Sequence, residues 1–297
     1  MKVLSLFDGI SCGLVALKNL GIDVTDYYAF EIDANAIKVS NKNHPEVKRC
    51  GNVLEADFAQ FKGFDLLLGG SPCQDLSIAK NNREGLKGSK SSLFWKYKEA
   101  LDIVQPKFFL FENVASMKDE DRDIITEALG VQPVMINSEA FVPQTRKRYY
   151  WTNIPIDEIK ASRHIFREIM QDEVDAKFYY DKPFVLEDDR TKNVIATIEL
   201  NTYRMNKLVY NPDGVVGCLT CVSGGYQEKK VYDEKKNRVR KITPLEYERL
   251  QGLPDNYTEG ICNGKRYTVC GNGWTVPVIE HILKGIKNEA TSTQGNI

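Results

Sequence analysis

The stretch VLSLFDGISCG, residues 3–13, decides the class of fold. Residues 3–7 are a short apolar run, which predicts a buried strand of a parallel sheet. Gly9 and Gly13 follow it, and glycines let the backbone turn tightly and approach a ligand at the start of a helix. A strand, a turn and a helix in this order open an α/β domain. The spacing is not the G-x-G-x-x-G of dinucleotide-binding proteins.

The same alternation of short apolar runs and helical patterns continues through the first half of the chain. The predicted strands are 3–7, 27–31, 65–68 and 108–112, followed by a closing pair at 134–137 and 148–153. The predicted helices are 13–20, 34–43, 91–104 and 119–129. We therefore expect an α/β fold with a mostly parallel, doubly wound sheet and helices on both of its faces.

The alternation stops after Pro155, and residues 156–238 predict a second, smaller domain that is rich in loops. Regular helix signals return at Thr243, where Thr-Pro-x-Glu is typical of a capped helix start. A final amphipathic helix is predicted at 276–287. We expect residues 1–155 and 239–297 to form the main domain around the inserted segment.

Composition excludes several classes of protein. The 297 residues are 42% apolar and 27% charged, which is typical of a globular chain. No apolar run approaches the roughly 20 residues of a membrane span. Seven scattered cysteines indicate a reducing compartment, so we expect a cytoplasmic protein, and three histidines argue against a His-rich metal site.

Two basic tracts stand out from a net charge of −1. Residues 80–98 carry six basic side chains against one acidic, and residues 227–241 carry seven against three. Such tracts can bind a polyanion along one face, with lysines 229, 230, 235 and 236 meeting phosphates. The alternative is that both tracts are ordinary solvated surface.

Polar side chains follow the first three predicted strands. Glu31 ends the second strand, where a carboxylate can accept hydrogen bonds from ribose hydroxyls. Asn52 follows a stretch that could form a further strand, the third in the chain, ahead of 65–68 as the fourth, and it could meet an adenine edge. Together with residues 7–12 they predict an adenosine-containing ligand at the carboxyl ends of the strands, although a plain strand–turn–helix would need no ligand.

A cysteine follows the fourth strand in Gly69-Gly70-Ser71-Pro72-Cys73-Gln74. A lone cysteine is most often a small buried side chain. A thiol protease would need a histidine as base, and His44, His164 and His281 have no catalytic context. If Cys73 is a nucleophile, a group other than imidazole must activate the reaction.

Glu112 ends the next strand, beside the strand that leads to Cys73. A carboxyl group there could donate a proton to a substrate ring nitrogen. In Gln144-x-Arg146-x-Arg148 the two arginines alternate along an extended segment, so we expect them to point the same way and grip an anion or carbonyl. These groups suit addition of a thiolate to carbon 6 of a pyrimidine, which makes carbon 5 nucleophilic toward a methyl group.

Eight blocks of residues, in order, resemble those of the cytosine-5 DNA methyltransferases, and the resemblance runs from Val3 to Lys287 apart from the middle segment. The blocks are Phe7-Asp8-Gly9 with Gly13; Glu31; Gly51-Asn52-Val53; Ser71-Pro72-Cys73-Gln74; Glu112-Asn113-Val114; Gln144-x-Arg146-x-Arg148; Arg240-x-x-Thr243-Pro244-x-Glu246-x-x-Arg249-Leu250-Gln251-Gly252; and Gly271-Asn272-Gly273-Trp274-x-Val276. One block is weak evidence, whereas eight in order are specific. The resemblance implies a Rossmann-like methyltransferase fold with a target-recognition domain at 156–238.

The resemblance also implies S-adenosylmethionine as cofactor, duplex DNA as partner and a cytosine that is flipped out of the helix. The implied catalytic residues are Cys73 as nucleophile, Glu112 on the cytosine edge, Arg146 holding the base and Arg148 supporting the pocket. The implied cofactor contacts are Phe7, Asp8, Gly9, Ile10, Ser11, Cys12, Glu31, Ile32, Asn52, Val53, Ser71, Pro72, Asn272, Gly273 and Trp274. The implied DNA contacts are Gln74, Ser77, Lys80, Arg83, Lys87, Thr220, Ser223, Gly224 and Gly225.

Some blocks resemble particular branches of the family. Phe7-Asp8-Gly9-Ile10 and the segments 70–77 and 273–277 resemble the vertebrate de novo branch, whereas Gln144-Thr145-Arg146 and Leu250-Gln251-Gly252 resemble bacterial enzymes. We expect an enzyme of a bacterium or of a phage-infected host cell. The family usually has Asp where Asn52 stands, and an amide oxygen can still accept from an adenine amino group without the charge.

Three other readings remain open at this point. A transfer-RNA cytosine methyltransferase would share the fold, a regulatory relative would bind DNA without catalysis, and a nicotinamide-dependent oxidoreductase would share the strand–turn–helix unit. Cys218-x-x-Cys221 suggests zinc, but Cys262 and Cys270 are badly spaced as a second pair, so no metal is expected. The sequence does not decide the recognition site, the oligomeric state or whether a restriction endonuclease acts alongside.

Overall fold

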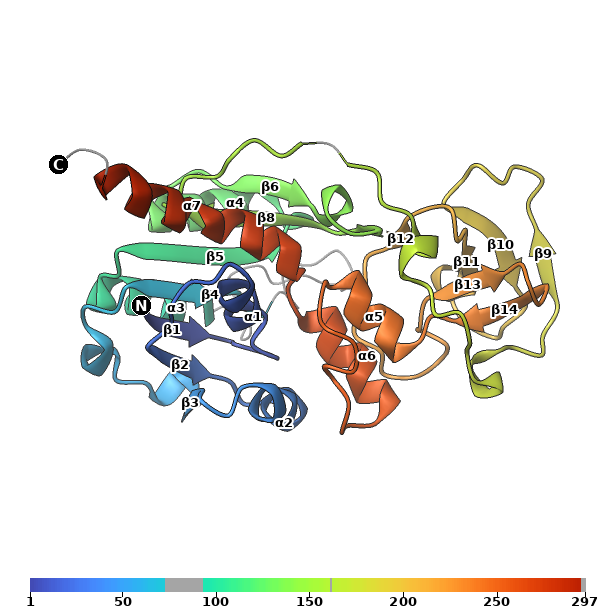
Figure 1. Cartoon of the computed structure of the whole chain (residues 1–297), viewed down its shortest axis with the longest axis horizontal. Helices are drawn as coiled ribbons and strands as arrows, with labels where there is room; N and C mark the ends of the chain where they lie inside the picture. The colour runs from blue at the N-terminus through green and yellow to red at the C-terminus, as the bar shows by residue number, and fades with distance from the viewer. Residues whose placement is uncertain (73–92, 161, 295–297) are drawn as a thin grey trace. The chain divides into compact units, whose positions relative to one another are not determined.

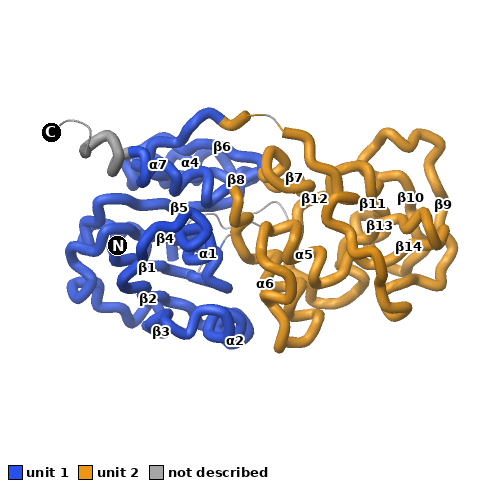
Figure 2. Tube along the Cα trace, viewed as in Figure 1, with its two compact units in different colours: residues 1–137, 147–158, 278–297 blue, residues 138–146, 159–277 orange. Residues whose placement is uncertain are grey.

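The computed structural model describes residues 1–72, 93–160 and 162–294. The chain forms two compact units, coloured separately in Figure 2. The first unit comprises Met1–Asn137, Lys147–Glu158 and Val278–Ile297, and the second comprises Ser138–Arg146 and Ile159–Pro277. Each unit has its own sheet, so each is described by itself.

A seven-stranded sheet forms the centre of the first unit, in the order β3-β2-β1-β4-β5-β8-β6 (Figure 1). The strands are β1 (Lys2–Leu6), β2 (Asp26–Phe30), β3 (Lys48–Gly51), β4 (Leu66–Gly69), β5 (Phe108–Val114), β6 (Val134–Asn137) and β8 (Lys147–Thr152). The five strands from β3 to β5 pair in parallel, and β8 runs antiparallel to both β5 and β6. The predicted doubly wound α/β fold is confirmed.

Helices cover both faces of this sheet. The helices of the unit are α1 (Cys12–Asn19), α2 (Ala34–Asn43), α3 (Phe94–Val104), α4 (Asp119–Leu129) and most of α7 (Val276–Gln294). Alternate strand residues such as Leu4, Leu67 and Phe109 pack with α3 and α4 in one buried cluster. Helices α1 and α7 lie side by side, and Asn19 donates to Glu280 at 2.6 Å between them.

One row of paired residues crosses the five parallel strands near their carboxyl ends. Gly51 pairs with Phe30, Phe30 with Leu6, Leu6 with Gly69, and Gly69 with Phe111. Phe7, Glu31 and Asn52, which come next in the chain, therefore leave the sheet along one edge. Glu112 follows Phe111 at the same level but remains within β5, paired with Tyr150 of β8. The carboxyl edge is the one at which open α/β sheets bind ligands.

The second unit contains a five-stranded sheet in the order β14-β13-β11-β10-β9 and a two-stranded pair of β12 with β7. The strands are β7 (Gln144–Thr145), β9 (Phe184–Leu186), β10 (Val194–Ile198), β11 (Leu208–Tyr210), β12 (Val216–Gly217), β13 (Lys230–Asp233) and β14 (Arg238–Lys241). Helices α5 (Pro244–Leu250) and α6 (Asn263–Asn272) complete it. Thr243 and Glu246 form the expected capping box at the start of α5, with Pro244 in its first turn.

The second unit extends beyond the segment 156–238 that the sequence suggested. Strand β14 pairs with β13, and Tyr247 of α5 and Tyr267 of α6 join the same buried cluster as Val231. Residues 239–277 therefore pack with the segment 156–238, and only the part of α7 from Val278 onward belongs to the first unit. Among the described residues, no helix has the length and apolar character needed to cross a membrane.

Two helical glycines provide a test of the packing of α7. A Cβ at Gly285 would clash with the carbonyl oxygen of Pro155 and lie 2.8 Å from Cγ2 of Ile154, whereas a Cβ at Gly264 in α6 would meet nothing within 4 Å. We expect Gly285→Ala to lower the free energy of unfolding by about 1–3 kcal/mol because the site is overpacked. Gly264→Ala should leave it unchanged or raise it by up to about 1 kcal/mol. Denaturant titration of both variants measures this, and equal effects would contradict the contact.

Candidate active site

The loop after β1 is held in an unusual backbone conformation. Phe7, Gly9 and Ser11 have φ values of 58°, 58° and 62°, which lie in the left-handed region. The amide of Gly9 donates to Oε2 of Glu31 at 2.8 Å, and the amide of Asp8 donates to the carbonyl oxygen of Phe30 at 3.1 Å. These two bonds attach the loop to the end of β2.

Glu31 also holds the chain that follows it. Its Oε1 accepts from the amides of Ile32 at 2.7 Å and Asp33 at 2.8 Å, just before α2 begins. The side chain of Ile32 is 72% exposed. An exposed apolar side chain therefore stands beside a carboxylate at the ligand-binding edge of the sheet.

Asn52 follows β3 and begins a short 3₁₀ turn (Val53–Glu55). Its Oδ1 accepts from the amide of Leu54 at 3.1 Å, so the side chain caps this turn. Val53 is buried, whereas Leu54 is 57% exposed. The capping bond uses one lone pair of an amide oxygen that has two.

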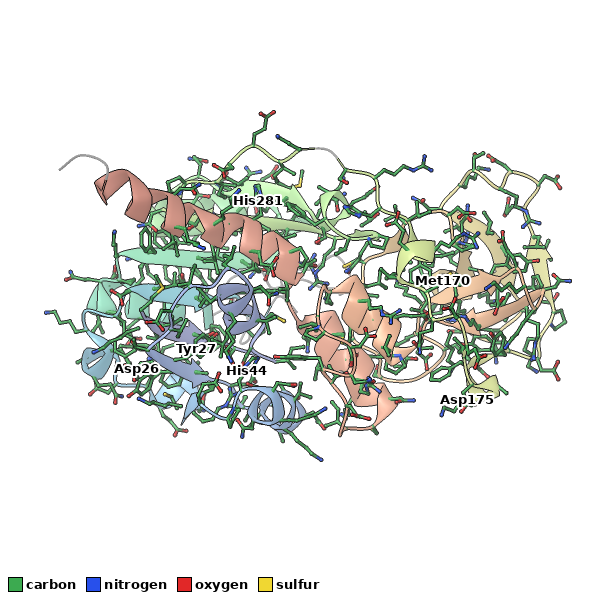
Figure 3. The ribbon with its side chains drawn as sticks, viewed as in Figure 1. Asp26, Tyr27, His44, Met170, Asp175 and His281 are labelled. Carbon is green, nitrogen blue, oxygen red and sulfur yellow. The ribbon has the colours of Figure 1, made fainter. Side chains whose placement is uncertain are left out.

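The side chains of Ile10, Ser11 and Cys12 point into the protein, because all three residues are buried. The carboxylate of Asp8 is also directed inward and accepts from the hydroxyl of Tyr27 at 2.8 Å. Tyr27, which is labelled in Figure 3, is buried. The sequence named Asp8 and residues 10–12 as cofactor contacts. Their burial means that any such contact would involve mainly backbone atoms of the loop.

The segment before Cys73 is attached to β5. Nδ2 of Asn113 lies 3.3 Å from both the carbonyl oxygen and the hydroxyl of Ser71, and its Oδ1 accepts from the amide of Val114 at 2.8 Å. Ser71 is buried and Pro72 half-buried. Cys73 and the predicted DNA contacts Gln74, Ser77, Lys80, Arg83 and Lys87 lie outside the described residues.

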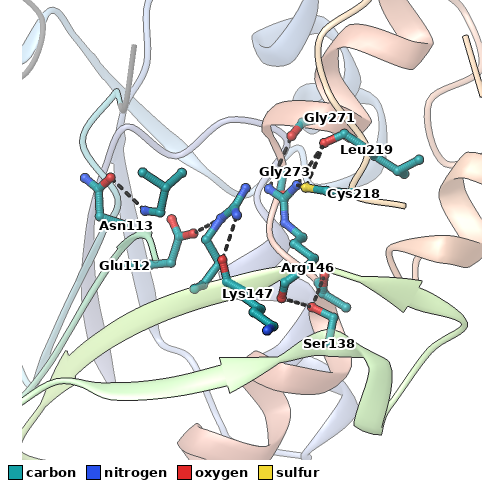
Figure 4. A network of polar contacts seen from close by, with 12 residues as sticks. Glu112, Asn113, Ser138, Arg146, Lys147, Cys218, Leu219, Gly271 and Gly273 are labelled. Atoms are coloured by element: carbon teal, nitrogen blue, oxygen red, sulfur yellow. Dashed lines mark hydrogen bonds and ion pairs between the residues drawn. The ribbon is translucent and has the colours of Figure 1, made fainter. Parts of the chain in front are cut away.

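Glu112 and Arg148 form an ion pair, with 2.8 Å between Nε of Arg148 and Oε1 of Glu112 (Figure 4). Both side chains are largely buried, at 12% and 13% exposure. Strand pairing brings them together, because β8 runs antiparallel to β5 and places Arg148 opposite Val114. The sequence named both residues but did not pair them.

Arg146 binds several backbone carbonyl oxygens of the second unit. Its Nη1 donates to the carbonyl oxygen of Leu219 at 3.1 Å, and its Nη2 donates to those of Gly271 at 3.2 Å and Gly273 at 3.0 Å (Figure 4). The residue is 4% exposed. Arg146 thus bonds backbone oxygens, whereas Arg148 pairs with Glu112, and the strand is interrupted between β7 and β8. That the two arginines grip one anion or carbonyl together stays a prediction.

The turn at 272–274 packs against the recognition segment. A Cβ on Gly271 would lie 2.5 Å from the carbonyl carbon of Thr220, so only glycine allows this approach. Oδ1 of Asn272 accepts from the thiol of Cys221 at 2.8 Å. Asn272 is exposed, Gly273 buried and Trp274 half-buried.

A buried polar network that sequence reasoning missed surrounds Arg146. Gln144 donates through Nε2 to the carbonyl oxygen of Leu250 at 2.8 Å, and its Oε1 accepts from the amide of Leu219 at 3.1 Å. Thr275 donates to Oε1 of Gln251 at 2.8 Å. Gln144 and Gln251 belong to the blocks by which the sequence resembles its family. Their place in those blocks was the signal in the sequence that could have indicated a buried polar network.

The predicted base-reading residues Thr220, Ser223, Gly224 and Gly225 are all exposed. A neighbouring turn, residues 202–207, had not been predicted. Thr202 donates to the carbonyl oxygen of Gly225 at 2.9 Å, and Tyr203 is 85% exposed. The exposed surface of this region therefore includes both segments.

The lysines of the second basic tract differ in accessibility. Lys230 is buried, and its Nζ donates to the carbonyl oxygens of Tyr226 and Glu228, both at 2.7 Å. Burial lowers the pKa of Lys230 to about 8 and also lowers the pKa of Lys229. Lys235 and Lys236 are exposed. The expectation that all four lysines meet phosphates is wrong for Lys230, whose ammonium group is already bound inside the protein.

No group of three or more His, Cys, Asp or Glu side chains suited to a metal occurs in the described part of the chain. The thiol of Cys221 donates to Asn272, and that of Cys218 lies 3.5 Å from Nη1 of Arg146. These contacts give both cysteines roles in packing.

The fold and these contacts define an α/β enzyme with polar groups gathered at the carboxyl edge of a parallel sheet, the architecture of a methyltransferase. The chain belongs to the C-5 cytosine-specific DNA methylase family, which it matches over residues 1–288. It is a DNA cytosine-5 methyltransferase, and the family implies a methyl donor.

Two relatives illustrate the similarity in sequence. The chain is 32% identical to the orphan methyltransferase M.SPRI of Bacillus phage SPR, over 96% of this chain and 97% of that protein. It is 27% identical to the type II methyltransferase M.HpaII of Haemophilus parainfluenzae, over 95% of this chain and 88% of that protein.

Solved structures agree on the fold. The Entamoeba histolytica methyltransferase EhMeth superposes with a TM-score of 0.74 at 17% identity, covering 98% of each chain. The DNMT2 of Spodoptera frugiperda superposes with a TM-score of 0.71 at 20% identity, covering 96% of this chain and 98% of that one. At these identities the likeness bears on the fold alone.

A comparison of Asn113, near the end of β5, with Asn153, which follows β8 and bonds to the start of β5, tests whether Asn113 positions the segment before Cys73. Asn153 bonds the amide of Phe109 and the carbonyl oxygen of Lys107, far from the carboxyl edge of the sheet. We expect Asn113→Ala and Asn153→Ala each to lower the free energy of unfolding by about 1–3 kcal/mol. Only Asn113→Ala should slow methyl transfer, by about 10- to 100-fold, because it displaces Ser71. Single-turnover assays at saturating DNA measure this, and equal rates in the two variants would exclude the role.

Proposed function

We propose that this enzyme binds S-adenosylmethionine along the edge of the sheet that follows the row from Gly51 to Phe111, and methylates a cytosine flipped out of duplex DNA. The single observation that carries the proposal is this row. It brings the loop 7–12, Glu31, Asn52 and Glu112 from four different strands to one edge.

The residues at this edge fit an adenosine-containing donor. Exposed Ile32 and Leu54 offer apolar contact for a base, beside the oxygen acceptors of Glu31 and Asn52 for ribose hydroxyls and an adenine amino group. Glu31 binds the loop amide of Gly9 as well, so one carboxylate would orient both the loop and the ribose. The donor supplies an electrophilic methyl group when bound. Phe7, Gly9, Val53, Ser71, Pro72 and the turn 272–274 complete the proposed contacts.

The proposed chemistry starts with the Cys73 thiolate, which forms a bond to carbon 6 of the cytosine. Carbon 5 then attacks the donor's methyl group, whose bond to the sulfonium sulfur breaks, so that the donor would leave as the neutral thioether S-adenosylhomocysteine. A base removes the proton from carbon 5, and the bond between the Cys73 sulfur and carbon 6 breaks, which restores the ring and the thiolate. Extrusion of the base is needed because carbon 6 is shielded within a stacked duplex. Ser71, two residues before Cys73, is buried and bonded to Asn113, which supports the proposal that the chain leading to Cys73 is held in place.

Glu112 and Arg148 are proposed as the groups that meet the cytosine. Their 2.8 Å ion pair fixes a carboxylate and a guanidinium side by side. The guanidinium can donate to the carbonyl oxygen of the cytosine, and the carboxylate can accept from its amino group, or from its ring nitrogen once that nitrogen carries a proton. Arg146 receives a different role from the one implied by resemblance. We assign it as a positioning residue, because its guanidinium is bonded to the backbone at Leu219, Gly271 and Gly273.

The second unit is proposed as the DNA-recognition unit. Its exposed loop at Ser223–Gly225 contains consecutive left-handed glycines, which permit a close approach of backbone to a base edge. The adjoining turn adds Tyr203, Arg204 and Lys207. We propose that the loop and the turn read bases, and that exposed lysines bind phosphates.

The enzyme is proposed to act in the cytoplasm of a bacterium or of a phage-infected cell, in keeping with relatives from a phage and a bacterium. A cognate restriction endonuclease, if present, would act separately. Bisulfite sequencing of plasmid DNA from cells that express the chain tests the proposal directly. Protected cytosines should occur at one recognition sequence, and their absence would refute the proposed activity.

Removing the proposed nucleophile tests the covalent mechanism. Cys73→Ala should abolish methyl transfer while leaving the dissociation constant for S-adenosylmethionine within about twofold, because the thiol attacks the base. The wild type should also form a stable adduct with DNA carrying 5-fluorocytosine at the target, since fluorine cannot leave as a proton does. Denaturing gel electrophoresis detects the adduct. Normal turnover by Cys73→Ala would overturn the mechanism.

The exposed and bound lysines give a matched pair of variants for DNA binding. Lys235→Gln/Lys236→Gln should weaken binding and reduce the slope of log affinity against log salt by about 1–2, as expected for lost phosphate contacts. Lys229→Gln/Lys230→Gln should lower stability and leave the slope unchanged, because Lys230 is bonded internally. Both pairs should methylate the same sequence. Fluorescence anisotropy at several salt concentrations measures the slopes, and equal slopes would place residues 235–236 away from DNA.

A further inference from the structure

We propose that Arg49 is a positioning residue for the methyl donor, acting through Asp8 to hold the loop 7–12 in its binding conformation. The inference rests on the proposed donor site. Arg49 lies in β3, outside every block by which the sequence resembles its family, and does not belong to the proposed ligand contacts. Its guanidinium is directed toward the loop after β1.

The contacts of Arg49 join three elements of the first unit. Nη1 donates to Oδ2 of Asp8 at 3.2 Å, Nε donates to Oδ1 of Asn41 at 3.0 Å, and Nη2 donates to the hydroxyl of Ser40. Arg49 is 19% exposed at its side chain, and Asp8 is 1% exposed. A planar guanidinium can serve three acceptors in fixed directions at once, whereas an ammonium group on a flexible stem cannot hold the same geometry.

Asp8 is the centre of this arrangement. Besides Arg49, its carboxylate accepts from the hydroxyls of Ser5 at 2.8 Å, Tyr27 at 2.8 Å and Ser11 at 2.5 Å. An ionised carboxylate that is buried requires a charged partner as well as hydrogen bonds, and Arg49 is its ion-pair partner within hydrogen-bonding distance. The pair therefore helps to hold the Asp8 carboxylate in place.

Arg49 reaches Ser11 by a second route. The hydroxyl of Ser40, which accepts from Arg49, lies 2.5 Å from the hydroxyl of Ser11. Ser11 thus bonds both to Asp8 and to Ser40, and Arg49 holds both of these partners. The two routes meet at a residue directly before α1.

This support matters because the loop is strained. Phe7 and Ser11 are not glycines, yet both have left-handed φ values of 58° and 62°. Side-chain-bearing residues adopt this conformation only when their surroundings impose it. Without the Arg49–Asp8 pair, we expect the loop to populate other conformations in the free enzyme. Donor binding would then include the cost of ordering the loop, which lowers affinity.

The test compares Arg49→Met with a matched variant of the neighbouring residue, Lys48→Met. Lys48 lies on the same strand and makes an exposed ion pair with Asp26 at 2.5 Å, away from the loop. Titration calorimetry on the donor-free protein measures the dissociation constants for S-adenosylmethionine and S-adenosylhomocysteine. Hydrogen exchange of residues 8–12, and binding to a DNA duplex, are measured on the same samples.

We expect Arg49→Met to raise both cofactor dissociation constants by about tenfold or more and to speed amide exchange in the loop. Its affinity for DNA should stay within about twofold of the wild type. Arg49→Lys should fall between the wild type and Arg49→Met, because it keeps the charge but not the three-way geometry. If Arg49→Met does not fold, the comparison of Arg49→Lys with the wild type provides the test. Lys48→Met should leave both cofactor dissociation constants within about twofold.

A double-mutant cycle with Asp8→Asn locates the effect. If Arg49 acts through Asp8, Asp8→Asn combined with Arg49→Met should be scarcely weaker than the worse single variant. A fall in thermal stability with unchanged cofactor affinity and loop exchange would overturn the proposal and leave Arg49 with a structural role. A wild type that binds neither cofactor would instead refute the proposed donor site. The two failures are therefore distinguishable.

Discussion

The structure depends on the register of five parallel strands. Backbone hydrogen bonds align Gly51, Phe30, Leu6, Gly69 and Phe111 in one row, so the residues that follow them emerge at a single edge. Parallel pairing forces the carboxyl ends to the same side, and both faces of the sheet are already covered by helices. Groups that we propose to bind ligands, from positions as distant as 7 and 112, are gathered there by main-chain geometry.

Several polar side chains at this edge already accept hydrogen bonds from the protein itself, without any ligand. Glu31 binds three amides and Asn52 caps a turn, while Asp8 is buried among four donors. Such bonds fix the direction of a side chain at little entropic cost during binding. Asn113 is a further example, because its side-chain amide orients Ser71, which precedes the proposed nucleophile in the chain. Preorganisation is thus distributed over residues that need not touch substrate.

In the second unit, Arg146 and Gly271 form one junction between the recognition segment and the turn at 272–274. The guanidinium binds carbonyl oxygens from both, and the absence of a Cβ at Gly271 lets the backbone at Thr220 approach. A buried arginine is tolerated there because its guanidinium donors are directed at backbone carbonyl oxygens. A substitution of Arg146 or Gly271 would therefore alter the backbone position of both segments.

The sequence by itself determined the class of fold, most element boundaries and the family, because strand and helix periodicities and eight ordered blocks are local signals. It also singled out Glu112, Arg148 and Asn52. Only the tertiary structure decided that Arg148 pairs with Glu112, that Arg146 binds backbone, that Lys230 is bound internally, and that Arg49 reaches Asp8. Residues 239–277 likewise joined the second unit through packing of β14, α5 and α6. These outcomes depend on contacts between residues far apart in the chain, and alternation along one strand cannot reveal which distant carbonyl, carboxylate or sheet edge a side chain will meet.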